Sequence, residues 1–274
     1  MTLEVIGDSK VKLPSLTTRN FSHTMVISNN NELMTLGKGY HGDIRNQCYK
    51  LVNGIWQNQN PLTERRSSSV GISMPDGIYC FGGEDSPCTS DFLPNGKRVW
   101  QVGPTVPAPG IENGFGVAIS PTELMLVGGW KTENKILMYN CERRTWTKVG
   151  KLLQGRYYHR CFFYGGEIVV TGGIDKGFLK STELINISNG TSRKVGDLNV
   201  ARRQHGMGIA HINGKSKLIV FGGQAANSSF LDSIEEWDEV SESWKMSTMK
   251  MSRAKSAFGY CQFPPFQNQT HINK

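Results

Sequence analysis

The chain has 274 residues, of which 38% are hydrophobic and 31 are glycine, and its formal net charge is +8. No apolar run approaches the roughly 18 residues that a membrane helix needs, and the first ten residues lack the basic and apolar regions of a signal peptide. The positive charge is modest and comes without a lysine-rich run or an aromatic-interleaved RNA-binding motif. We therefore expect a cytoplasmic protein that binds neither membrane nor nucleic acid.

Two short segments at the start of the chain have the pattern of paired strands. They run from Thr2 to Ile6 and from Val11 to Leu13, and they resemble the third and fourth strands of units that follow later.

Between these segments and the far end, one pattern recurs, an apolar run that stops at glycines. The five copies are LMTLGKG ending at Gly39, IYCFGG at Gly83, LMLVGG at Gly129, IVVTGG at Gly173 and LIVFGG at Gly223. From Gly82 to Gly128, Gly172 and Gly222 the steps are 46, 44 and 50 residues, a period typical of repeat proteins. Each run predicts a half-buried strand that ends in a turn requiring positive φ.

The remainder of each unit is equally regular. A polar loop follows the glycines, then a segment with an aromatic residue, then in most units a tryptophan. The tryptophans are Trp56, Trp100, Trp146 and Trp244. With the apolar segment that opens each unit, this makes four short strands, and four-stranded antiparallel sheets bury both faces when they stack radially. The sequence predicts an all-β propeller, with the tryptophans packed between its blades.

These features resemble the Kelch family, in which a glycine pair closes the second strand and a tryptophan lies in the fourth. Two units also carry Arg-x-x-His before the first strand, as Arg156 to His159 and Arg202 to His205. The resemblance covers about Thr2 to Phe263 and is strongest to the Kelch domain of BTB-Kelch proteins. Departures are Gly37-Lys38-Gly39 in the first unit, Ser192 where a tryptophan is expected, and GIENGFGV in the third unit, whose pocket position would be Glu112 or Asn113.

The number of blades depends on the two ends of the chain. Arg253 to Phe263 has the pattern of a first strand, so both ends together supply three strands of a sixth blade. We expect six blades with an irregular closing blade built from both termini, although the pattern also fits a piece of a longer protein. The propeller would span residues 1–263, and the polar residues 264–274 have the composition of a disordered tail.

Arginines precede the first strands of successive units, so the repeat would place them around one rim. The candidates for partner binding are Arg19, Arg66, Arg156, Arg202 and Arg253. In Kelch propellers this rim is the usual ligand-binding face, and guanidinium groups suit carboxylates or phosphates. The resemblance therefore implies an acidic peptide or degron as client. In the alternative reading, the arginines bind backbone carbonyls and brace adjacent blades.

Other conspicuous residues have structural alternatives. Trp130 directly follows a glycine pair and would either anchor a partner at the mouth or fold back on its loop. His159 and His205 are expected to pack or to bond with a loop. The six cysteines form no CxxC pair and lack the spacing of a zinc site. We expect no metal, no cofactor and no catalytic residue.

Three classes of function remain compatible with the resemblance. The first is a protein-interaction module like the substrate-recognition domains of cullin-RING ubiquitin ligase adaptors, which would reach the ligase through a BTB domain that this chain does not contain. The second is a stand-alone scaffold for cytoskeletal (actin) or signalling proteins. The third is a Kelch enzyme such as a sugar-acid epimerase, whose substrate an arginine-lined pocket could hold. We favour a binding module without catalysis that recognises an acidic segment.

Overall fold

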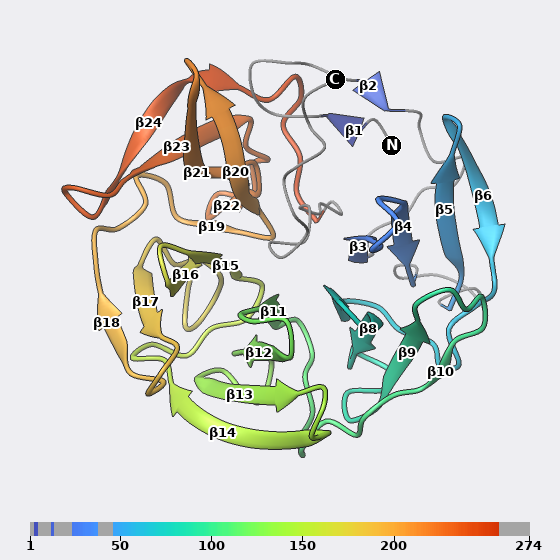
Figure 1. Cartoon of the computed structure of the whole chain (residues 1–274). Helices are drawn as coiled ribbons and strands as arrows, with labels where there is room; N and C mark the ends of the chain where they lie inside the picture. The colour runs from blue at the N-terminus through green and yellow to red at the C-terminus, as the bar shows by residue number, and fades with distance from the viewer. Residues whose placement is uncertain (1–2, 5–11, 14–23, 38–45, 258–274) are drawn as a thin grey trace.

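The computed structural model describes residues 3–4, 12–13, 24–37 and 46–257, and these residues form strands and turns without a helix. Five four-stranded antiparallel sheets are arranged as blades around a centre (Figure 1). The predicted all-β propeller is confirmed. Within the described ranges, no helix is long and apolar enough to cross a membrane.

The blades follow one another in chain order. Blade one contains β3 (Thr24–Ile27), β4 (Leu33–Leu36), β5 (Cys48–Val52) and β6 (Ile55–Gln59). Blade two contains β7 (Val70–Met74), β8 (Gly77–Phe81), β9 (Ser90–Pro94) and β10 (Gln101–Val102). Blade three contains β11 (Phe115–Ala118), β12 (Glu123–Val127), β13 (Lys135–Asn140) and β14 (Thr145–Lys151). Blade four contains β15 (Arg160–Tyr164), β16 (Glu167–Thr171), β17 (Thr182–Asn186) and β18 (Ser192–Lys194). Blade five contains β20 (Gly206–Ile212), β21 (Lys215–Phe221), β23 (Ser233–Asp238) and β24 (Ser243–Lys250).

The expected number of six blades is wrong, because the structure shows five. The two N-terminal segments do form strands, but β1 (Leu3–Glu4) and β2 (Lys12–Leu13) have two residues each and pair only with each other in the described part of the chain. This small sheet lies between blade five and blade one (Figure 1). Most of the C-terminal strand expected from Arg253 to Phe263, and the expected tail, lie outside the described residues.

The apolar core lies between blades. First strands of consecutive blades contact each other, as β7 contacts β11 and β11 contacts β15, so they form the inner wall of the ring. Alternate residues of each blade face the preceding or following one, and they form clusters that join neighbours. One such cluster contains Val70 of blade two together with Leu126 of blade three.

Three tryptophans pack between blades as predicted. Trp100 and Trp244 are each 4% exposed, and each belongs to a cluster shared with the preceding blade. The indole nitrogen of Trp244 also donates to Thr182 Oγ1 of blade four at 2.9 Å. Trp146 packs against the cluster between blades two and three, whereas Trp56 is only half-buried.

Blade four lacks this tryptophan and contacts blade three through its backbone instead. Ser192 Oγ donates to the carbonyl of Lys151 at 3.0 Å. Beside it, a Cβ added to Gly190 would lie 2.0 Å from the carbonyl oxygen of Val149, and one added to Gly150 would lie 2.0 Å from Gly190 O. The two glycines allow the strand of one blade and the turn of the next to approach more closely than side chains would permit.

The glycine pairs likewise permit contact between blades. Gly128 has φ of +59°, and a Cβ there would lie 2.6 Å from the carbonyl oxygen of Arg156 in the next blade. The following residue, Gly129, donates its N–H to that same carbonyl at 3.0 Å. Gly173 donates to Arg202 O in the same way at 2.9 Å. The pairs therefore connect each second strand to the loop that leads into the next blade.

Candidate functional site

Two sets of loops meet on one side of the ring. One set leads into the first strands, and the other follows the glycine pairs, and the glycine hydrogen bonds join them. We call this side the mouth face. The turns that join first to second strands and third to fourth strands lie on the opposite face.

A closed series of backbone hydrogen bonds lines the mouth face. Each loop places one residue in the left-handed region, with φ between 50° and 56°, and its N–H donates to the equivalent carbonyl of the preceding blade. These residues are Ser68, Asn113, Tyr158, Gln204 and Ala257. The N···O distances along the series are 3.4, 2.8, 2.9 and 3.2 Å. The left-handed region is unfavourable for non-glycine residues, yet none of the five is glycine.

Three of the five predicted arginines are buried behind this series. Arg66, Arg156 and Arg202 are each 0% exposed. Arg156 Nη2 lies 2.6 Å from Glu183 Oε1, and its Nη1 donates to the carbonyl of Gly172 at 3.0 Å. The other two repeat this arrangement. Arg202 pairs with Glu235 at 2.6 Å and Gly222 O at 2.8 Å, and Arg66 pairs with Asp91 at 2.7 Å and Gly82 O at 2.8 Å.

The carboxylates of these pairs bind the loop as well as the arginine. Glu183 accepts hydrogen bonds from the backbone N–H groups of Leu153 and Gln154 at 2.7 and 3.0 Å. Burial lowers the pKa of Arg156, and the charge of Glu183 opposes that shift. Each arginine thus ties the loop leading into its blade to the second and third strands of that blade, while its own carbonyl binds the preceding blade.

Blade three replaces this ion pair with apolar residues. Ile111 occupies the place of the arginine, because Gly83 donates to its carbonyl at 2.9 Å. Leu137 occupies the place of the carboxylate and packs against the cluster that contains Ile111. The carbonyl of Gly128, which an arginine would bind, accepts Thr132 Oγ1 at 2.9 Å. The expected pocket position at Glu112 or Asn113 is therefore wrong, since Ile111 is the equivalent residue.

The arginines thus have the bracing geometry that the sequence left as an alternative. A side chain with no exposed surface does not contact a partner in this conformation, so Arg66, Arg156 and Arg202 are corrected as direct contacts. Arg253 is exposed but is not equivalent to them, because Gly223 donates at 2.7 Å to Lys255 instead. Arg19 lies outside the described residues.

A row of aromatic rings crosses the mouth face from blade three toward blade five. Trp130 is 43% exposed, and its ring packs edge-on against Tyr157 with centroids 5.0 Å apart. Tyr157 in turn lies 5.2 Å from Tyr158. Trp130 therefore both contacts its neighbouring loop and keeps an accessible surface, as the two sequence readings allowed. Phe178 and Arg203 continue the row, and we call these five residues the aromatic row.

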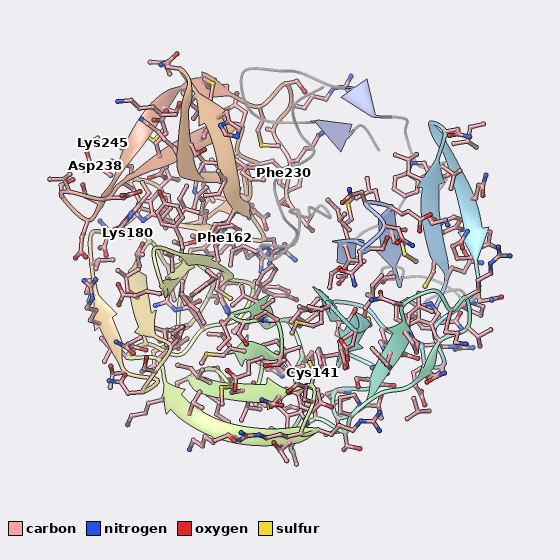
Figure 2. The ribbon with its side chains drawn as sticks, viewed as in Figure 1. Cys141, Phe162, Lys180, Phe230, Asp238 and Lys245 are labelled. Atoms are coloured by element: carbon pink, nitrogen blue, oxygen red, sulfur yellow. The ribbon has the colours of Figure 1, made fainter. Side chains whose placement is uncertain are left out.

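Arg203 is a residue that the sequence interpretation passed over in favour of its neighbour. Its guanidinium lies 5.6 Å from the ring of Tyr158 and 5.1 Å from that of Phe178. Beyond it, Phe230 is 58% exposed in the loop after β21 and lies nearer the centre of the ring than Asp238 and Lys245, which pair at the outer edge (Figure 2).

A register signal distinguishes the buried arginines from the accessible ones. A buried apolar residue stands four positions before each buried arginine: Leu62 before Arg66, Leu152 before Arg156 and Leu198 before Arg202. The adjacent arginines, Arg65 and Arg203, fall outside this register and reach the surface.

The two histidines are buried, as predicted. His205 Nε2 lies 2.9 Å from Thr171 Oγ1, and His159 is also 0% exposed. Burial lowers the pKa of both well below the usual histidine range, and nearby arginines lower it further. Across the residues the structure describes, no group of three or more histidine, cysteine, aspartate or glutamate side chains could hold a metal ion.

Blades two and three supply a different chemistry to the mouth face. Glu84 accepts from Ser67 Oγ at 2.8 Å, and Glu112 lies close enough for its charge to be felt. Burial first, and then Glu84, raises the pKa of Glu112. The face is therefore acidic on one side and aromatic with a cation on the other.

Comparison with known proteins identifies relatives that contain Kelch repeats. Kelch-like protein 23 from Mus musculus is 26% identical over 183 residues, which cover 64% of this chain and 31% of the relative. A RING finger domain and kelch repeat-containing protein from Dictyostelium discoideum is 21% identical over 208 residues, or 73% of this chain and 20% of the relative. Beta-scruin from Limulus polyphemus is 25% identical over 117 residues, or 40% of this chain and 12% of the relative.

The chain spans less than a third of the length of each of these relatives. No family model matches it. The resemblance to Kelch-repeat propellers is nevertheless confirmed by these relatives together with the four-stranded blades.

Proposed function

We propose that this Kelch-type propeller is a protein-interaction module whose client, an acidic peptide segment, docks on the mouth face across the aromatic row. The observation that supports it best is the continuous row from Trp130 to Arg203, in which a large ring remains 43% exposed. Exposed aromatic and arginine side chains provide much of the binding energy in protein interfaces. Loops on a rigid scaffold are also where binding residues concentrate.

The strained residues of the mouth face support the same location. At a left-handed position glycine would relieve backbone strain of order 1 kcal/mol, yet Tyr158 and Gln204 occupy two such positions. Side chains that are kept at an unfavourable backbone conformation often serve function. Tyr158 belongs to the aromatic row itself.

We further propose that the chain recognises substrates for a ubiquitin ligase in the cytoplasm, without catalysis of its own. One relative's name joins kelch repeats with a RING finger domain. This link would require a domain or subunit outside the present sequence.

The experiment is a quantitative pull-down from cells of the source organism with the full chain as bait. The test variant combines Trp130→Ala with Tyr157→Ala. The matched control is Val240→Ala, because Val240 is 98% exposed in a turn on the opposite face. Loss of at least tenfold in specific partners with the double variant alone is the expected result, and ligase subunits among the partners would support the adaptor role.

Equal partner lists for the double variant and wild type would refute docking on the mouth face. Urea unfolding of all three proteins shows whether they are folded, since both target rings lie on the surface loops. If the double variant is destabilised, Gln204→Gly provides a second probe, because it removes a mouth side chain while relaxing the backbone.

A further inference from the structure

Arg203 differs from every buried arginine of the mouth face in one respect. Arg66, Arg156 and Arg202 each have a carboxylate within 2.7 Å. Arg203 has no carboxylate within ion-pair distance among residues 46–257 and the other described segments, and it is only half-buried. Its charge is therefore not neutralised within the part of the molecule that is described.

The guanidinium of Arg203 is nevertheless held in place. Its Nε and Nη2 both donate to Gln224 Oε1, at 3.0 and 2.8 Å. Tyr158 and Phe178 lie on it at 5.6 and 5.1 Å. Gln224 is fixed in turn, because β19 (Arg202–Arg203) pairs with β22 (Gln224–Ala225), so that Arg203 and Gln224 are direct partners.

This arrangement leaves one side of the guanidinium for a ligand. Both bonds to Gln224 use the same acceptor oxygen, and Nη1 donates to no described residue. A planar guanidinium that is already oriented loses less conformational entropy when it binds an anion, and it binds carboxylates through paired, charge-assisted hydrogen bonds. The missing partner is therefore an anion, and it would come from outside the described chain.

We propose that Arg203 binds an aspartate or glutamate side chain of an extended client segment, whose apolar side chain lies on Trp130 and Tyr157. This inference rests on the proposed function and specifies the client's chemistry. Three ring contacts of 5.0, 5.2 and 5.6 Å connect Trp130 to Arg203. An extended strand advances about 3.3 Å per residue, so the acidic and apolar residues lie within about five positions of each other.

The test is a display selection with the folded full chain and random twelve-residue peptides that are flanked by constant sequence, so that no terminal carboxylate is available. Enriched peptides should carry Asp or Glu within about five positions of an aromatic or large aliphatic residue. Selection on Arg203→Gln should lose the acidic preference and keep the apolar one. Selection on Arg203→Glu should replace the acidic preference with Lys or Arg. The matched control is Arg193→Gln, whose arginine pairs with glutamates on the outer surface.

The outcomes separate the inference from the proposed function. Peptides that bind wild type without an acidic preference, or with the same preference in Arg203→Gln, overturn the inference and leave docking on the mouth face intact. A second library with free C-termini yields the only binders if the carboxylate is terminal, which also overturns it. If neither library yields peptides that depend on Trp130, docking of peptides on this face fails as well.

Discussion

A buried arginine of this propeller satisfies three kinds of acceptor at once. It binds a carboxylate of the third strand, the carbonyl of the glycine pair and the carbonyl two residues before that carboxylate, as Arg156 does with Glu183, Gly172 and Ser181. Such a pair is costly to desolvate, so its contribution depends on every bond being made. Blade three shows the alternative solution, in which Ile111 and Leu137 need no partners.

We expect single substitutions in the ion pair of blade four to be far more harmful than the double one. Arg156→Ile or Glu183→Leu leaves one buried charge without its partner and should lower the free energy of unfolding by about 3–5 kcal/mol. The double variant recreates the residues of blade three and should lose clearly less than the sum. Urea unfolding of the four proteins of the cycle measures the coupling.

The control for this cycle is an ion pair on the surface. Arg193 and Glu242 lie 2.6 Å apart and are each more than 40% exposed, so Arg193→Ala should cost about 0–1 kcal/mol. Additive losses in the cycle of Arg156 and Glu183 would show that the two side chains do not depend on each other.

At the scale of strands and turns, the boundary between blades three and four differs from its neighbours. Where other blades insert a tryptophan, this boundary relies on the close approach of Gly150 to Gly190 and on the Ser192 hydrogen bond. Its stability therefore depends on backbone fit rather than on a large buried ring.

We expect Gly190→Ala to destabilise the protein more than a comparable glycine elsewhere. Gly190 has φ of +68° and no room for a Cβ, whereas Gly54 has φ of +76° and nothing within 4 Å of an added Cβ. Gly54→Ala should cost about 1 kcal/mol from backbone conformation alone. Gly190→Ala should cost at least about 2 kcal/mol more, because a backbone carbonyl must move. Thermal unfolding of both variants gives the comparison, and equal losses would show that the boundary adapts freely.

The strands and the glycine pairs could be predicted because each leaves a periodic mark in the sequence. The exposure of the arginines could not, because Arg202 and Arg203 differ by one position and only the register decides which one points inward. The register was readable from the buried leucine four residues earlier. That signal also shows Lys255 as the equivalent of Arg202, since Met251 is the buried residue four positions before it. The number of blades depended on terminal segments with too few residues to show a period.

At the scale of the whole ring, the inner wall contains two histidines that folding keeps uncharged. Burial is the main cause, and the charges of Arg156, Arg160 and Arg202 add to it. A group whose pKa is lowered by folding contributes stability that is present above its unfolded pKa and is lost as pH falls, because the unfolded chain takes up the proton first.

We expect the free energy of unfolding to decrease below about pH 6.5, by up to about 1.4 kcal/mol per pH unit for each buried histidine. Urea unfolding at pH 7.5 and pH 5.5 measures the decrease. His205→Gln keeps a side chain that can bond with Thr171 and should remove about half of the dependence. His211→Gln is the control, because His211 is exposed. An unchanged dependence in His205→Gln would attribute the effect to other groups.

The apolar pair of blade three also determines which parts of the molecule can be exchanged. Moving only the loop of blade four into blade three would place an arginine opposite Leu137, and moving only the third strand would place Glu183 opposite Ile111. Either chimera would contain a lone internal charge, whereas a transfer of loop and strand together would not. A blade of this protein is therefore a heritable unit whose halves have changed in concert, and recombination between blades would preserve folding only at boundaries that keep the two halves together.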